Sequence, residues 1–191
     1  MVGNTHTRTH MVRAAECRPY TRTVDLSAWY NEIMYKKHMY SRKPNRMRGF
    51  DYGDSRCYFI TVCATKKYEL FGEINNKEMH LSDLGKIVAD EIPNIALTYP
   101  CVHVLSNVVM PNHVHIIIKI GIDSPSISQV MNQWKRAISI KAGFSPWQKS
   151  FHDHIIRDEV GFTKITEYIK NNIANWDGDC FHPKNKSTVL V

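Results

Sequence analysis

The chain has 191 residues, of which 43% are hydrophobic and 23% are charged, and its net charge is +7. This length suits one domain with a good core and is short for two, and the composition is that of a globular protein. Five scattered cysteines without a C-x-x-C pair argue against a disulfide framework or a cysteine zinc site and favour a reducing compartment. Because there is no apolar run of membrane-spanning length and no signal-peptide segment, we expect a cytoplasmic protein without a membrane partner.

The positive charge is concentrated at the N-terminus. Residues 1–50 hold ten of the 25 lysines and arginines but three of the 18 acidic residues, so they carry the whole net charge. We interpret residues 1–47 as a basic, poorly ordered arm. Such an arm suggests a polyanionic partner, nucleic acid first. A solvated extension, or a start codon placed too early, is the alternative.

After this arm, the sequence shows regular periodicity. Residues 48–180 are predicted to form one domain, and residues 181–191 a C-terminal tail. The predicted order is strand, hairpin, helix, strand, strand, helix, strand and helix, which indicates an α+β, ferredoxin-like split-βαβ sheet (an RRM-like palm) with an added C-terminal helix. The ranges in chain order are 58–64, 70–81, 83–92 (N-capped by Ser82), 102–109, 113–120, 127–142, 151–157 and 162–172.

Two histidines open the strand predicted at 113–120. His113 and His115 are two residues apart, and side chains alternate faces along a strand, so both point the same way. Two imidazoles on one face are a ready pair of metal ligands. The alternative is two polar residues on a solvated face.

The last predicted helix carries a second polar pair. Tyr168 and Asn172 are four residues apart and therefore share a helix face. Tyr168 is either a functional hydroxyl or an amphipathic packing residue with its hydroxyl in water.

Taken together, several separate stretches resemble, in order, the single-tyrosine HUH transposases. The most similar branch is that of the REP-associated tyrosine transposases, relatives of the smallest bacterial insertion-sequence transposases. The resemblance covers about residues 46–180 and departs from the family pattern at Ile173, where relatives commonly have proline. The stretches are Phe50–Tyr52, Tyr58–Cys63, Leu70–Gly72, Val109–His115, Trp147–Arg157 and Tyr168–Asn172.

The resemblance implies roles for four residues. His113 and His115 match the metal ligands, Tyr168 matches the nucleophile, and Asn172 matches the polar residue that completes the metal site. The implied cofactor is a divalent cation, Mg²⁺ or Mn²⁺. Phosphodiester cleavage fits this set, because it needs a nucleophile and a cation that neutralises charge on the phosphate oxygens.

The implied function is that of a DNA transposase. It would cut and transfer single-stranded DNA near hairpins through a 5′-phosphotyrosine intermediate, and it would associate with the bacterial nucleoid when bound to DNA. A monomer and a homodimer both remain open. The alternative is a catalytically silent or domesticated relative that binds nucleic acid.

Further residues are predicted to contact DNA. Trp134, on the helix 127–142, is expected in the core because of its spacing from Val130 and Ile138. His152 and His154 share a strand face and are either site residues or ordinary polar positions. The predicted DNA contacts are Arg46, Arg48, Lys135, Arg136 and His154.

Overall fold

A computed structural model describes residues 56–121 and 123–186 of the chain. The predicted basic arm (residues 1–47) and the predicted DNA contacts Arg46 and Arg48 lie outside the described residues, so their roles stay predictions. Within the described part, no helix is long and apolar enough to cross a membrane.

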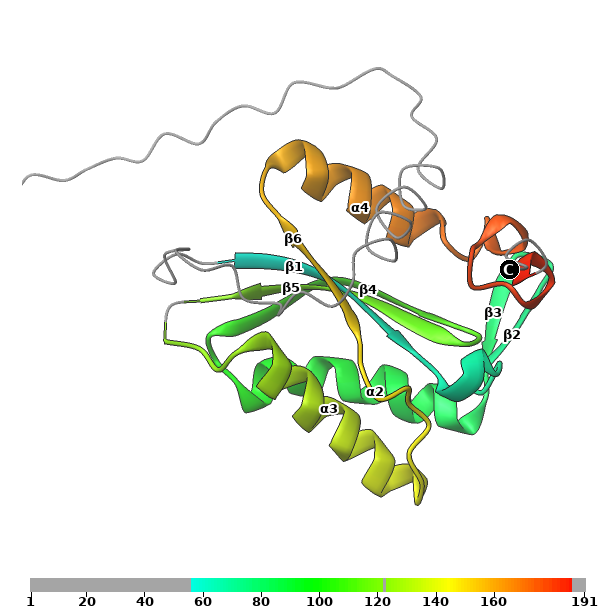
Figure 1. Cartoon of the computed structure of the whole chain (residues 1–191), viewed down its shortest axis with the longest axis horizontal. Coiled ribbons are helices and arrows are strands. Elements are labelled where there is room, and N and C mark those ends of the chain that lie inside the picture. The colour runs from blue at the N-terminus through cyan, green and yellow to red at the C-terminus, as the bar shows by residue number, and fades with distance from the viewer. Residues whose placement is uncertain (1–55, 122, 187–191) are drawn as a thin grey trace, which may run out of the picture.

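A four-stranded antiparallel sheet forms the centre of the molecule (Figure 1). Its order is β4-β5-β1-β6, so the first strand lies in the middle between β5 and β6. This is the strand order of the split-βαβ fold, and the predicted fold class is confirmed. The strands are β1 (Arg56–Cys63), β4 (Val102–Met110), β5 (His113–Ile120) and β6 (His152–Ile156).

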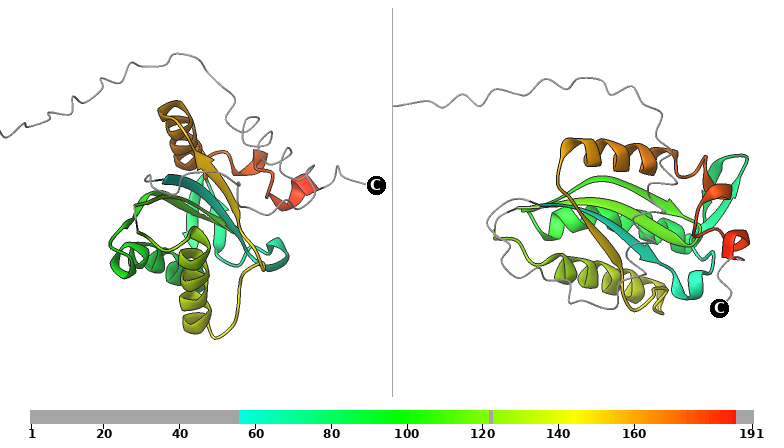
Figure 2. Two further views of the ribbon diagram at one scale, coloured as in Figure 1. Left: turned by 60° about the vertical axis from the view of Figure 1, so that its left-hand side comes forward. Right: turned by 45° about the horizontal axis from the view of Figure 1, so that its top comes forward.

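Within the described residues, three α-helices cover the two faces of the sheet. Helices α2 (Asp83–Thr98) and α3 (Ile127–Ala142) lie on one face, and α4 (Glu159–Asn171) lies on the other (Figures 1 and 2). A hairpin of β2 (Gly72–Asn75) and β3 (Glu78–Leu81) stands at one end of the sheet. Three short 3-10 turns complete the described chain: η1 (Thr65–Lys67), η2 (Trp176–Gly178) and η3 (Pro183–Lys186).

Some predicted boundaries shift in the structure. The predicted end of α2 before Pro93 is wrong, because the helix continues to Thr98 and buries Ile95. A proline costs a helix one backbone hydrogen bond, and burial of the continued apolar stripe offsets this cost. Helix α4 begins three residues earlier than predicted, where the Asp158 carboxylate accepts the N–H of Gly161 at 2.7 Å as an N-cap.

Alternation along the strands gives the sheet two different faces. Val114, Ile116 and Ile118 of β5 pack into the core under α2 and α3. Their neighbours His113, His115 and Ile117 point to the α4 face, where Ile117 joins a second apolar cluster with Ile165 and Ile169. The predicted site residues of β5 and α4 are therefore brought to the same side of the sheet.

Candidate metal and nucleophile site

Backbone pairing places the two histidines at the start of β5, on the α4 face of the sheet. His113 lies opposite Cys63 of β1, and His115 lies opposite Thr61. Both imidazoles are fully buried, and their Nε2 atoms are 3.0 Å apart. The prediction that the two side chains share a face is confirmed, and the alternative of a solvated polar face is wrong.

Asn112 determines which nitrogen of His113 carries a proton. Its Nδ2 donates to the backbone carbonyls of Phe181 at 2.8 Å and Lys67 at 3.3 Å. Its Oδ1 must therefore be the atom that lies 2.8 Å from Nδ1 of His113, and it accepts from the N–H there. The Nε2 of His113 therefore carries a lone pair, which can accept a hydrogen bond from Nε2 of His115 at 3.0 Å in the absence of a metal.

Thr61 has the corresponding place beside His115. Its hydroxyl lies 2.9 Å from Nδ1 of His115 and can either donate to that nitrogen or accept from it. His115 can therefore adopt both neutral tautomers, including the one in which Nε2 has a free lone pair. Partners of this kind orient metal-ligating histidines in proteins.

Both imidazoles are neutral near pH 7. Burial, with a smaller contribution from the positive charge of Lys67, lowers the pKa of His113 to about 3. Burial and the neighbouring His113 also lower the pKa of His115 well below its usual value, against an opposing effect of Asp179. Neutral imidazole is the form that binds metal ions.

Helix α4 brings Tyr168 against this pair. The side chain is buried, and its hydroxyl lies 3.4 Å from Nε2 of His115. The hydroxyl also donates to Oδ2 of Asp179 at 3.2 Å. Tyr168 is therefore not the surface packing residue, with its hydroxyl in water, that was the alternative reading of the sequence.

Asp179 is a site residue that the sequence reasoning missed. It is buried, and one ligand atom from each of His113, His115 and Asp179 lies within 4.8 Å of the others. The only signal in the sequence is an acidic residue seven positions after Asn172, in a segment without periodicity. Its backbone contacts, described below, are what turn its carboxylate toward the histidines.

Asn172 lies beside Asp179, one turn after Tyr168. Its Nδ2 contacts Oδ2 of Asp179 at 3.4 Å, while its Oδ1 is buried and has no hydrogen-bond partner. An unpaired buried carbonyl oxygen costs free energy unless something binds it. This feature supports the predicted role of Asn172 as a ligand, which stays a prediction.

These donors fit a divalent cation. Two imidazole nitrogens that bind one ion at about 2.1 Å and at a right angle to each other are about 3 Å apart, and the two Nε2 atoms are 3.0 Å apart. The carboxylate of Asp179 would supply the negative charge that two neutral histidines lack. Nitrogen and oxygen donors together suit Mn²⁺ or Zn²⁺ as well as Mg²⁺.

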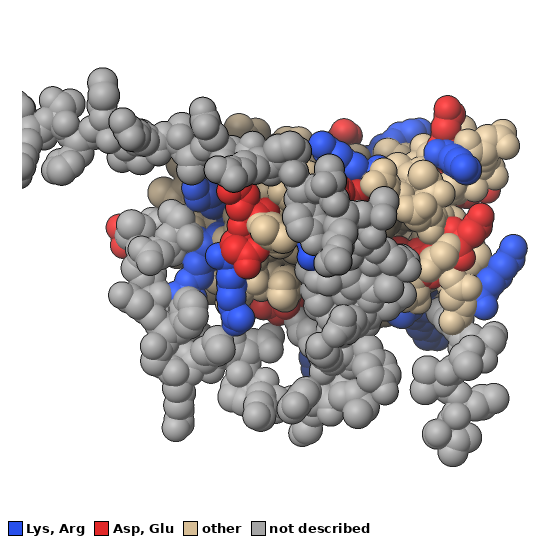
Figure 3. All heavy atoms as spheres, turned by 90° about the horizontal axis from the view of Figure 1, so that it is seen from above, with Lys and Arg blue, Asp and Glu red and all other residues tan. Residues whose placement is uncertain are grey.

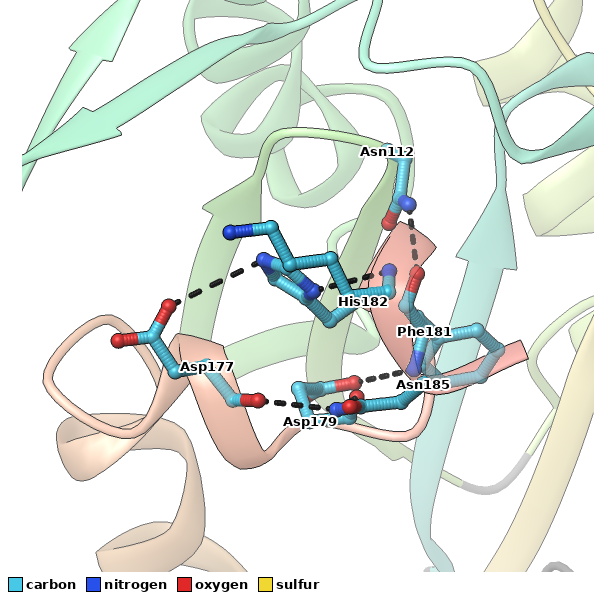
Figure 4. A network of polar contacts seen from close by, with 7 residues as sticks. Asn112, Asp177, Asp179, Phe181, His182 and Asn185 are labelled. Carbon is cyan, nitrogen blue, oxygen red and sulfur yellow. Dashed lines mark hydrogen bonds and ion pairs between the residues drawn. The ribbon is translucent and has the colours of Figure 1, made fainter. Parts of the chain in front are cut away.

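Polar contacts within the segment after α4 hold it together and join it to Asn112 (Figure 4). The N–H of Phe181 donates to Oδ1 of Asp179 at 2.7 Å, and the Phe181 ring lies 4.5 Å from the His113 ring. Asn185 ties the turn together by donating to the carbonyls of Asp177 and Asp179. Phe181 and His182 are buried, so the packed region continues past residue 180, where the sequence placed the start of a tail.

The predicted DNA contact of Lys135 rested on its exposure, and that expectation is wrong. Lys135 is 9% exposed, and its Nζ donates to the carbonyl of Gln148 at 2.6 Å. It lies four residues after Met131 and three before Ile138, which puts it on the buried stripe of α3. Burial lowers its pKa.

The other predicted contacts have different surroundings. Trp134 is in the core, as expected, and Arg136 is exposed. His154 is half-buried on β6 opposite Phe59, and His152 lies opposite Thr61, so both share the sheet face of His115. Roles of Arg136 and His154 in DNA binding stay predictions.

Comparison with known proteins addresses the family and the fold separately. An uncharacterized protein of Haemophilus influenzae is 32% identical over 171 residues, and the match covers 76% of this chain and 95% of that protein. The chain belongs to the same family as this protein. No model of a described protein family matches the chain.

A solved structure of a REP-associated tyrosine transposase bound to a REP hairpin aligns with a TM-score of 0.55. The alignment covers 70% of this chain and 74% of that one, at 19% identity. The chain has the fold of a REP-associated tyrosine transposase. The resemblance that the sequence motifs indicated is thus confirmed for the fold, and the chemistry of the site has to be argued from its residues.

Proposed function

We propose that this transposase-fold protein is a metal-dependent, single-strand DNA endonuclease and strand transferase. The observation that carries the proposal is that the Tyr168 hydroxyl contacts both His115 and Asp179, two members of a buried group that could hold a metal ion. We further propose that His113, His115 and Asp179 hold Mg²⁺ or Mn²⁺, with Asn172 as an additional ligand. The ion would neutralise charge that develops on the phosphate oxygens.

In this proposal, the oxygen of Tyr168 attacks a backbone phosphorus. A bond forms between the tyrosine oxygen and phosphorus, and the bond between phosphorus and the 3′-oxygen breaks. The Tyr168 hydroxyl loses its proton as it attacks, and the leaving 3′-oxygen takes up a proton, so the products are a 5′-phosphotyrosine and a free 3′-hydroxyl. Because the covalent link conserves the phosphoester, attack by another 3′-hydroxyl rejoins the strands and releases the tyrosine.

The surrounding residues orient this chemistry. Asp179 accepts the hydrogen bond of the Tyr168 hydroxyl and so holds it toward the histidines. Asn112 accepts a hydrogen bond from Nδ1 of His113, which keeps the proton on that nitrogen and leaves Nε2 of His113 unprotonated. By analogy with the REP hairpin bound to the solved transposase, we propose that the substrate is a single strand next to a DNA hairpin.

One observation favours the second candidate, a silent relative that only binds nucleic acid. The two histidines are fully buried, and the ring of Phe181 lies against His113. A phosphate can reach the histidines only if this cover moves. The binding-only candidate accounts for a closed site, but it leaves the contacts of Tyr168 without a use.

Formation of a covalent adduct separates the two candidates. We expect purified protein with Mn²⁺ to form an adduct, stable in denaturing gels, with single-stranded hairpin oligonucleotides taken from DNA that flanks its gene. Replacement of Tyr168 by phenylalanine removes the nucleophilic oxygen and keeps the ring, so the adduct should be lost. Chelation of the metal should have the same effect.

The controls decide how a negative result is read. Tyr58→Phe removes a hydroxyl from a tyrosine of β1 on the opposite face of the sheet and should leave the adduct unchanged. An adduct with Tyr168→Phe would refute the assigned nucleophile. Binding of the hairpin by wild-type protein without any adduct, in Mg²⁺ and in Mn²⁺, would favour the silent relative.

A further inference from the structure

Two loops meet beside the site at the end of β1. The N–H of Thr65, in η1, donates to the carbonyl of Pro146 at 2.7 Å, and the N–H of Gln148 donates to the carbonyl of Cys63 at 2.9 Å. These bonds join residues 64–68 to residues 143–149, which lead from α3 to β6. The two loops lie next to each other in Figures 1 and 2.

Each loop exposes an aromatic ring. Tyr68 is 55% exposed and Phe144 is 52% exposed. Single exposed apolar residues are ordinary, and these two rings differ from that case because the loops that carry them are bonded to each other. Gly143, in the left-handed conformation with φ of 76°, ends α3 just before Phe144 and presents the ring beyond the helix.

Three lysines lie on or next to the same two loops. Lys66 and Lys149 are exposed, and within the part of the chain that the structure describes neither takes part in an ion pair. Lys67 lies over the Phe181 ring, with Nζ 4.5 Å from its centroid. Three lysines with one acidic neighbour, Glu69, make this surface positive.

The backbone of η1 is also strained. Lys66 and Lys67 have φ of 51° and 57°, in the left-handed region that side-chain-bearing residues rarely adopt. Strain of this kind gathers at functional sites, because local stability alone does not favour it. Here it occurs at two successive lysines, of which Lys66 is exposed and Lys67 reaches the Phe181 ring.

This surface connects directly to the candidate site. Lys67 contacts the Phe181 ring, and that ring lies 4.5 Å from the ring of His113. A chain that crosses η1 therefore approaches the histidines through Phe181. By contrast, the described surface on the α4 side mixes acidic and basic side chains (Figure 3).

We propose that these loops form a stacking platform for single-stranded DNA, in which Tyr68 and Phe144 stack on unpaired bases and Lys66, Lys67 and Lys149 contact phosphates. The inference rests on the proposed function and deepens it, because it names the surface that leads a single strand to the site. Rings and lysines in alternation are the means by which proteins bind single strands without reading their sequence. Bases stacked in a duplex would not offer their faces to these rings.

Binding without metal tests the platform separately from cleavage. The probe is a fluorescein-labelled poly-dT strand of about 20 nucleotides, and the readout is fluorescence anisotropy. The double variant Tyr68→Ala/Phe144→Ala should bind it about tenfold more weakly, the order of magnitude of stacking on one or two bases. The variant Phe144→Tyr, with Tyr68→Phe, keeps both rings and should bind like wild type.

The controls address surface hydrophobicity and charge. Leu97→Ala/Val160→Ala removes exposed apolar side chains elsewhere and should have no effect. Replacement of Lys66, Lys67 and Lys149 by glutamine should reduce the slope of log affinity against log salt by about 2, as expected for three phosphate contacts to a single strand. Lys86→Gln removes an exposed lysine of α2 and should leave the slope unchanged.

Several outcomes would overturn the platform. They are a change below twofold in the double alanine variant, an equal loss in the leucine and valine control, or an equal loss on a duplex probe. If the proposed function fails while the platform is correct, the result is different: single strands still bind through the two rings, but no Tyr168 adduct forms.

Discussion

The two faces of the central sheet differ although the same strands supply both. Toward α2 and α3, β5 presents Val114, Ile116 and Ile118, which join one continuous apolar core. Toward α4, the alternate residues of β5 include the two histidines, and α4 adds Tyr168. The face toward α2 and α3 contributes most of the packing stability. The face toward α4 can therefore hold buried polar groups that contribute little to stability.

The core face should give the largest change in stability. Ile116→Ala removes a fully buried side chain on the α2 and α3 side, and we expect it to lower the free energy of unfolding by about 2–5 kcal/mol. Urea denaturation measures this loss. Ile116→Val, which leaves a smaller cavity, should cost ~1 kcal/mol. Equal and small losses in both variants would contradict the assignment of stability to this face.

The α4 face should instead make the free energy of unfolding of the metal-free protein depend on pH. In the folded chain the pKa of His113 is about 3, and in the unfolded chain it is near the ordinary value of 6.5. Below pH 6.5 the unfolded chain takes up a proton that folded His113 does not. The free energy of unfolding should therefore fall as the pH falls, by about 1.4 kcal/mol per pH unit for this residue.

Urea denaturation between pH 6 and pH 4 measures this slope. His113→Gln should make the slope shallower by about the contribution of one histidine, and His115→Gln should act in the same direction. His80→Gln, at an exposed position of the hairpin, is the control for loss of a histidine without loss of a buried imidazole. Identical slopes in wild type and in both site variants would show that the imidazoles are not buried and neutral.

Substitutions of Lys135 and Arg136 should have the smallest effects. They compare a buried and an exposed basic residue of α3. Lys135→Met should change the free energy of unfolding by less than about 1.5 kcal/mol and leave binding of single-stranded DNA unchanged, because its amine bonds to Gln148. Arg136→Ala, at an exposed position, should reduce the salt slope of DNA binding by ~0.7 if it contacts one phosphate. Loss of DNA binding in Lys135→Met would restore the prediction that Lys135 contacts DNA.

The parts of this molecule that could be predicted are those that periodicity determines. Alternation placed His113 and His115 on one face, helical spacing placed Tyr168 beside Asn172, and the order of elements indicated the sheet. These features follow from geometry within single elements, and motif resemblance added the roles that the residues would have.

The parts that could not be predicted depend on contacts between distant segments. Asp179 reaches the histidines because Phe181 and Asn185 bond to it in an irregular turn. Lys135 is buried because the chain after α3 folds back and presents the carbonyl of Gln148 to it. No local pattern marks Asp179. The spacing of Lys135 does place it on the apolar stripe of α3, but a lysine on a helix is ordinarily solvated.

The central claim is that His113, His115 and Asp179 form one metal site on the α4 face. Calorimetric titration of the metal-free protein with Mn²⁺ tests it most directly, with Asp179→Asn and Tyr168→Phe as the paired variants. We predict one bound ion per chain in wild type and in Tyr168→Phe, and binding weaker by at least about tenfold in Asp179→Asn, which loses a charged ligand. Unchanged Mn²⁺ affinity in Asp179→Asn, or no binding by the wild-type protein, would contradict the claim.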